Sequence, residues 1–66
     1  MASQTYIADG VNVPTAVVES IARMFPERAE FDAIMAQLRY SHLMGCFSFQ
    51  YAEMFCGVEP DGYLHT

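Results

Sequence analysis

The chain has 66 residues, of which 53% are hydrophobic and 14% aromatic, and its formal net charge is −5. A chain this short forms one small domain, residues 1–66, and its apolar content excludes intrinsic disorder because it supplies enough side chains for a core. Eight acids stand against three arginines and no lysine, which excludes the basic patch needed for direct nucleic-acid binding and disfavours anionic membrane surfaces.

The first ten residues, MASQTYIADG, contain no basic region followed by an apolar one. We therefore expect neither a secretory signal nor a transit peptide, and we expect a cytoplasmic protein. The next segment, TYIADGVNV at 5–13, places Asp9-Gly10 between short β-branched and aromatic runs, which predicts a hairpin with a tight turn. An irregular arm with one turn is the alternative.

A first helix is expected after Asn12, which would cap it, with Pro14 in its opening turn. Its apolar face follows helical spacing, and Pro26 ends it. The residues of that face are Val17, Val18, Ile21, Met24 and Phe25.

A second helix is expected from Glu27 to Met44, with two partly apolar faces. One face carries Phe31, Ile34, Met35, Leu38 and His42, and the other Ala33, Ala36, Tyr40 and Met44. A helix that is apolar on both sides packs on both sides, so we expect it to be the central element. Gly45 would break it.

The stretch from Tyr40 to Val58 holds nineteen residues and a single formal charge, Glu53, so it must be covered by other parts of the protein or by a partner. Polar residues interrupt it too often for a membrane span. We expect a third helix from Phe47 to Cys56, closed by Gly57. One apolar face would carry Phe47, Tyr51, Met54, Phe55 and Val58, and the other, with Phe49, Ala52 and Cys56, would lie against the hairpin or a second molecule.

Residues 59–62, EPDG, predict a turn, and the YLH that follows would add an edge strand to the N-terminal hairpin. In a helix, Cys46 and Cys56 would lie about 15 Å apart, beyond the roughly 7 Å between Cα atoms that a disulfide allows. We therefore expect free thiols. The fold prediction is mainly α, with α+β as a possibility: a compact three-helix domain with a short N-terminal β-hairpin or arm.

Only one pair of residues suggests catalysis or metal binding. His42 and Cys46 stand four apart, close enough on a helix to share a metal or to form a base and nucleophile. No tight ligand pair or orienting carboxylate accompanies them. We therefore expect no enzyme activity, no metal and no cofactor, with the thiol in the core and the histidine at its rim.

The carboxylates suggest a binding surface instead. Acids at the start of the second predicted helix complement the positive end of its dipole, but they could also join others in a surface facing a cationic groove. The candidate partner-binding residues are Glu19, Glu27, Glu30, Asp32, Glu59 and Asp61. Methionines, and at least one outward aromatic among Tyr40, Phe47, Phe49 and Tyr51, would anchor the partner.

In its size, its acidity and its lack of both basic patches and catalytic residues, the chain resembles phage-encoded inhibitors of bacterial defence, and among them the DNA-mimicking anti-CRISPR proteins. The resemblance is one of overall character. It implies that the protein blocks a nucleic-acid-binding groove of a CRISPR effector in the host cytoplasm, as a monomer or homodimer. The alternative is a structural or regulatory homo-oligomeric subunit that buries Phe47–Val58 in a symmetric interface.

Overall fold

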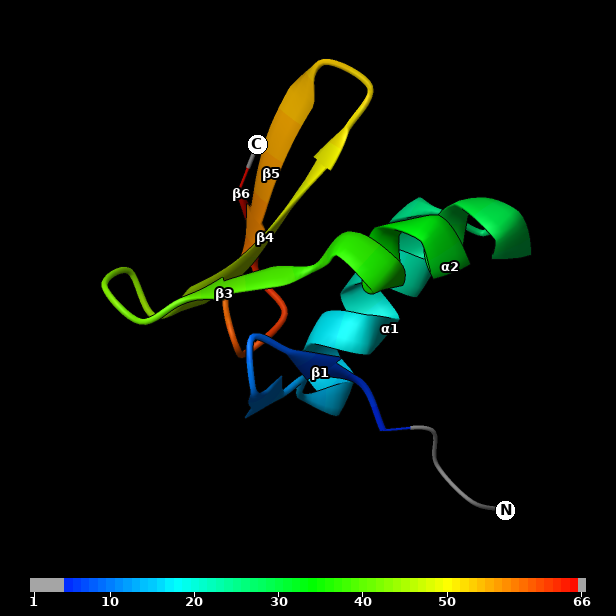
Figure 1. The fold of residues 1–66 in the computed structure, drawn as a ribbon. Helices are drawn as coiled ribbons and strands as arrows, with labels where there is room; N and C mark the ends of the chain where they lie inside the picture. The colour runs from blue at the N-terminus through cyan, green and yellow to red at the C-terminus, as the bar shows by residue number, and fades with distance from the viewer. Residues whose placement is uncertain (1–4, 66) are drawn as a thin grey trace.

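The computed structural model describes residues 5–65 and contains two helices and two antiparallel sheets (Figure 1). The smaller sheet pairs β1 (Ile7–Ala8) with β2 (Val11–Asn12). The helices are α1 (Thr15–Met24) and α2 (Arg28–Gln37). The larger sheet has the order β3-β4-β5-β6, with β3 at Arg39–Ser41, β4 at Cys46–Tyr51, β5 at Met54–Val58 and β6 at Leu64–His65.

The fold is therefore an α+β domain, and the prediction of a mainly helical three-helix domain is wrong. The prediction of an N-terminal hairpin is confirmed. Asp9 and Gly10 have φ of 50° and 81°, the positive values that this two-residue turn requires, and they bring Ala8 opposite Val11. The alternative of an irregular arm is not observed.

Helix α1 follows its predicted apolar face only in part. Val17 and Ile21 are fully buried and Phe25 is buried just after the last turn, whereas Met24 is exposed. The cap differs from the prediction, because Asn12 pairs in β2 and Pro14 occupies the N-cap position without a side-chain hydrogen bond. The helix ends before Pro26, as predicted, since a proline disfavours helical geometry at the residue before it.

The second predicted helix is too long. It ends at Gln37, because Leu38 turns to extended geometry (ψ 133°) and the next three residues pair with β4. The prediction that it packs on both sides is also wrong. Phe31, Ile34 and Met35 are buried, whereas Ala33 and Ala36 are exposed, so α2 has one buried face.

The third predicted helix, Phe47 to Cys56, does not exist. These residues form a β4–β5 hairpin that turns at Ala52 and Glu53, in which Phe47 faces Val58 and Phe49 faces Cys56. The alternation of CFSFQY has the period of a strand, whereas the helix prediction placed Phe47 and Tyr51 on one face and Phe49 on another. In a strand, Phe47 and Phe49 point to the same face of the sheet, and that face is buried.

Helices α1 and α2 lie on one side of the larger sheet, and the tip of the β4–β5 hairpin projects beyond them (Figure 1). The sheet residues that face the helices are buried, and they join the helical side chains in one hydrophobic cluster. On the sheet these residues are Phe47, Phe49, Cys56 and Val58. Phe25 contacts Phe49 edge-on, with ring centroids 5.8 Å apart.

Two predictions about the end of the chain have different outcomes. The turn at 59–62 is confirmed, since the Gly62 N–H donates to the Glu59 carbonyl. The strand after it forms, but Leu64 and His65 pair with β5 and not with the N-terminal hairpin. Both thiols are free, as expected, although the geometric reason is different: Cys56 faces the core and Cys46 lies on the opposite face of the sheet.

Candidate partner-binding surface

The six predicted carboxylates form two groups in the structure. Glu27, Glu30 and Asp32 lie at the start of α2. Glu19 projects from α1, and Glu59 and Asp61 flank the turn between β5 and β6. The fold therefore does not align all six along one element.

In the α2 group, two carboxylates have partners within the protein. Glu30 accepts the hydroxyl hydrogen bond of Tyr51, which raises the pKa of that tyrosine. Asp32 forms an ion pair with Arg28 at 3.2 Å, one helical turn away. Glu27 occupies the N-cap position, is exposed and makes no side-chain cap hydrogen bond. Within this group, Glu27 has the carboxylate most available to a partner.

The second group borders a hollow of about 360 Å³ between α1 and the β5–β6 turn. We call it the acidic groove. It is lined by Ala16, Glu19, Ser20, Arg23, Asp61, Gly62 and Tyr63. Two carboxylates and one guanidinium leave a net negative charge, and Tyr63, which is 62% exposed, adds an aromatic ring at the rim.

The acidic groove depends on a close contact between the turn and the helix. Gly62 has a φ of +94°, and a Cβ at this position would lie 2.9 Å from the carbonyl oxygen of Ala16. The Ser20 hydroxyl donates a 2.6 Å hydrogen bond to the Gly62 carbonyl. Asp61 accepts the N–H of Tyr63 at 2.9 Å, which orients its carboxylate. Local turn chemistry therefore places Asp61 and Tyr63 beside α1.

Glu59 lies just outside the groove and is paired with a histidine. Its Oε2 is 2.5 Å from Nε2 of His65, whose ring stacks at a tilt on Tyr63 with centroids 4.9 Å apart. This contact brings one more predicted carboxylate close to Tyr63. Ser20, Arg23 and Tyr63 were not among the binding residues predicted from the sequence; the signal for Tyr63 was an aromatic residue directly after a polar turn.

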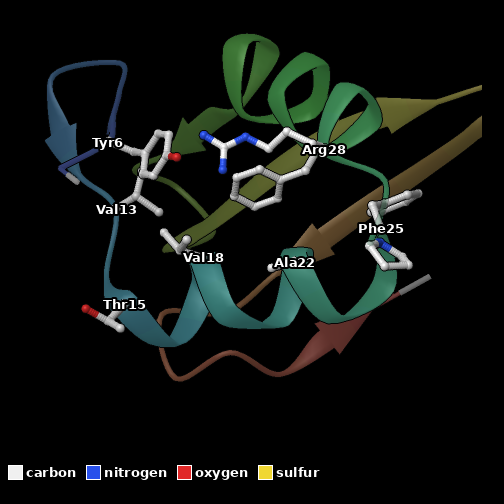
Figure 2. A pocket seen from close by; sticks show the side chains of 9 residues that line it. Tyr6, Val13, Thr15, Val18, Ala22, Phe25 and Arg28 are labelled. Atoms are coloured by element: carbon white, nitrogen blue, oxygen red, sulfur yellow. The ribbon is translucent and has the colours of Figure 1, made fainter. Parts of the chain in front are cut away.

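On the other side of α1 lies a larger hollow of about 450 Å³, which we call the apolar groove. The hairpin, α1 and α2 enclose it (Figure 2). It is lined by Tyr6, Val13, Thr15, Val18, Ala22, Phe25, Pro26, Arg28 and Phe31. Figure 2 shows the Arg28 side chain reaching from the start of α2 toward Tyr6, so one cation and the hydroxyl groups of Tyr6 and Thr15 accompany the apolar side chains of this groove.

The two grooves are separated by a single helix. Thr15, Val18 and Ala22 of α1 line the apolar groove, while Ala16, Glu19, Ser20 and Arg23 of the same helix line the acidic groove. Glu27 lies in the chain between two residues of the apolar groove, Pro26 and Arg28. The exposed side of α1 thus presents Glu19 in one groove, where Asp61 of the β5–β6 turn joins it, and Val18 and Ala22 in the other.

The predicted aromatic anchors lie elsewhere than expected. Phe47 and Phe49 are buried, and Tyr40 and Tyr51 are half-buried in contact with the core. The aromatic side chains that are exposed are Phe55 and Tyr63. The choice of Tyr40, Phe47, Phe49 and Tyr51 followed from the helix prediction, which assigned the wrong residues to the outer face.

The weak catalytic candidate depended on helical geometry that is absent. His42 is exposed in the turn before β4, where its ring meets Tyr40 edge-on, and Cys46 begins β4. Among residues 5–65, no three His, Cys, Asp or Glu side chains are close enough together to hold a metal ion. Across the same residues, neither helix has the length and hydropathy needed to cross a membrane.

Comparisons of the chain with protein-family models, with curated proteins and with solved structures find no match.

Proposed function

We propose that this protein is a small acidic inhibitor or adaptor, without enzymatic activity, that binds a larger protein through the exposed side of α1. The observation that carries the proposal is the pair of grooves on either side of that helix. Carboxylates on one side steer a basic partner toward the surface, and the apolar groove on the other side receives an apolar side chain of that partner.

The specific form that we propose is a phage-type anti-CRISPR protein acting in the host cytoplasm. Its target is a nucleic-acid-binding groove of a CRISPR effector, where carboxylates take the place of DNA phosphates. Glu19, Glu59 and Asp61 supply the charges beside the acidic groove, and Glu27, Glu30 and Asp32 supply those at the start of α2. Since four of the six also have partners within the protein, the apolar contact contributes much of the affinity.

The test is a gel-shift titration in which the purified protein competes with target DNA for purified CRISPR effector complexes. The wild type should displace DNA, and the displacement should weaken as NaCl is raised. The double substitution Glu19→Lys with Asp61→Lys should lower the apparent affinity by about tenfold or more. Glu53→Lys is the control, because Glu53 is exposed at the distant tip of the β4–β5 hairpin.

A second pair of variants tests the apolar groove. Ala22→Gln places a longer polar side chain in that groove and should weaken binding, whereas Ala33→Gln makes the same change at an exposed position of α2. Failure of the folded wild type to displace DNA from any effector would reject the anti-CRISPR form. If neither the charge reversals nor Ala22→Gln changes the affinity for the partner, the proposal that the partner binds the exposed side of α1 is wrong.

A further inference from the structure

The larger sheet has one face that the helices leave open. Side chains alternate along a strand, so the residues between the buried ones point away from α1 and α2. The strand register places the following side chains on the open face: Arg39 and Ser41 of β3, Cys46, Ser48 and Gln50 of β4, Phe55 of β5 and His65 of β6. Gly57 of β5 lies among them.

This open face has a hollow next to a ridge. The hollow is about 420 Å³, and its floor consists of small residues: Ser41, Cys46, Ser48 and Gly57. Phe55 and Met44 stand at its sides and are 70% and 76% exposed. Leu43, beside Met44 in the same turn, is 97% exposed. Large apolar side chains and a hollow that could receive them therefore occur on the same surface.

We propose that the open face binds a second copy of this chain. In a two-fold symmetric interface the same patch meets itself, so Phe55 of each copy enters the small-residue hollow of the other, and Met44 packs at its edge. A ridge beside a hollow is the shape that such a reciprocal contact requires. This inference is independent of the proposed function, which uses the side of α1.

Charge favours a second copy over a basic partner at this face. The carboxylates at its two edges have partners within the protein: Asp9 forms an ion pair with Arg39 at 2.9 Å, and Oε2 of Glu59 lies 2.5 Å from Nε2 of His65. Arg39 also places a guanidinium on the face itself, which a basic partner would have to approach. A basic partner would therefore find few unpaired carboxylates here. A second copy, which also carries a net charge of −5, meets less repulsion at this face than over the acidic groove.

The available area suits a weak dimer. A standard interface buries about 800 Å² per partner, roughly one sixth of the 4616 Å² surface of this molecule. The four strands span about 14 Å across, and the six residues of β4 extend about 20 Å. The sheet face alone therefore falls short of a standard interface, and the exposed turn with Leu43 and Met44 is needed to enlarge it. We therefore expect the dimer to dissociate into monomers when the protein concentration is in the micromolar range.

The test is sedimentation velocity on the full chain at about 10 μM and about 500 μM, on either side of the weak affinity expected for an interface of this size. The wild type should shift from monomer to dimer as its concentration rises. Because both copies are acidic, added NaCl should strengthen the dimer, the opposite of its effect on a basic partner. Phe55→Ser should raise the dimer dissociation constant about tenfold or more.

Ile7→Ser is the matched control, since Ile7 is 65% exposed but lies in the smaller sheet. Circular dichroism establishes whether each variant is folded. If Phe55→Ser is unfolded, Ser48→Arg replaces it: this substitution fills the hollow from its floor and should also weaken the dimer. A wild type that stays monomeric at both concentrations overturns the proposal. Three results with a dimeric wild type also overturn it: Phe55→Ser leaves the dimer intact, Ile7→Ser weakens the dimer as much as Phe55→Ser does, or added NaCl dissociates the dimer.

Discussion

At Gly62 a single hydrogen in place of a side chain allows the β5–β6 turn to touch α1. We predict that Gly62→Ala lowers the free energy of unfolding by about 2 kcal/mol or more, because the positive φ strains alanine and the added Cβ meets the Ala16 carbonyl. Urea denaturation measures the change. The matched control is Gly45→Ala, also at positive φ (+68°) but with no atom within 4 Å of its Cβ, which should cost about 1 kcal/mol.

Asp9 connects the two sheets through its carboxylate. It accepts the backbone N–H of Tyr40 at 2.9 Å and the Nε–H of Arg39 at 2.9 Å, and these hydrogen bonds, that of Tyr40 first, hold the pKa of Asp9 below its ordinary value. A carboxyl whose pKa is lowered by folding stabilises the protein above its unfolded pKa of about 4 and loses that contribution as the pH falls through the folded value.

We therefore predict that Asp9→Asn destabilises the protein at pH 7 and that its difference from the wild type shrinks as the pH falls below about 4. Asparagine is the appropriate replacement because it also tolerates the positive φ of this turn. Guanidinium unfolding at pH 7 and pH 3 measures the two differences. A difference that stays constant or grows toward pH 3 would contradict the assignment.

At the scale of elements, the end of α2 is coupled to the start of β3 by one side chain. In the register of β3 and β4, residue 37 would stand opposite Gln50, but the backbone of Gln37 is still helical. Its side-chain amide takes the place of the missing strand backbone: Nε2 donates to the Gln50 carbonyl at 2.8 Å, and Oε1 accepts the Gln50 N–H at 3.4 Å. The helix can therefore end here without leaving these two groups of β4 unpaired.

We predict that Gln37→Ala lowers the free energy of unfolding by about 1 kcal/mol, the net value of a typical hydrogen bond, since the contact is exposed. Gln50→Ala is the control: it removes the other side chain but keeps the backbone groups that Gln37 contacts, so its effect should be within about 0.5 kcal/mol. Urea denaturation of both variants compares them. Equal effects would show that the amide does not act through the Gln50 backbone.

The β4–β5 hairpin shows why local pattern misassigned an element. Phe47, Phe49 and Tyr51 alternate with Cys46, Ser48 and Gln50, which is the period of a strand. At helical spacing, however, Phe47 and Tyr51 fall on one face and Phe49 on another, so a helix with two apolar faces was predicted. The pairing with β5 decides for a strand, because Phe47 and Phe49 then each have a buried neighbour across the ladder, Val58 and Cys56. When a predicted helix has two apolar faces and too few neighbours to cover them, the segment should also be considered as a strand, whose side chains repeat every two residues.

For the whole molecule, stability depends on a small core. A chain of 66 residues has a total stability of about 3–10 kcal/mol, and truncating a buried phenylalanine costs about 3–5 kcal/mol. We predict that Phe47→Ala lowers the free energy of unfolding by about 3–5 kcal/mol, a large share of the total, whereas Phe55→Ala, the same change at an exposed site, shifts stability by about 0.5 kcal/mol or less. Thermal unfolding followed by circular dichroism measures both. A cooperative Phe47→Ala transition close to that of the wild type would contradict the core assignment.

Features that depend on neighbouring residues could be predicted from the amino-acid sequence: the Asp9-Gly10 hairpin, the end of α1 before Pro26, the turn at 59–62 and the acidity of the surface. The sequence did not determine whether residues 38–58 are helical or extended, because short apolar runs fit both periods until their partners are known. That choice, and with it the two grooves beside α1 and the open face around Phe55, was decided by tertiary packing, since only the assembled sheet gives Phe47, Phe49, Cys56 and Val58 one common face to bury.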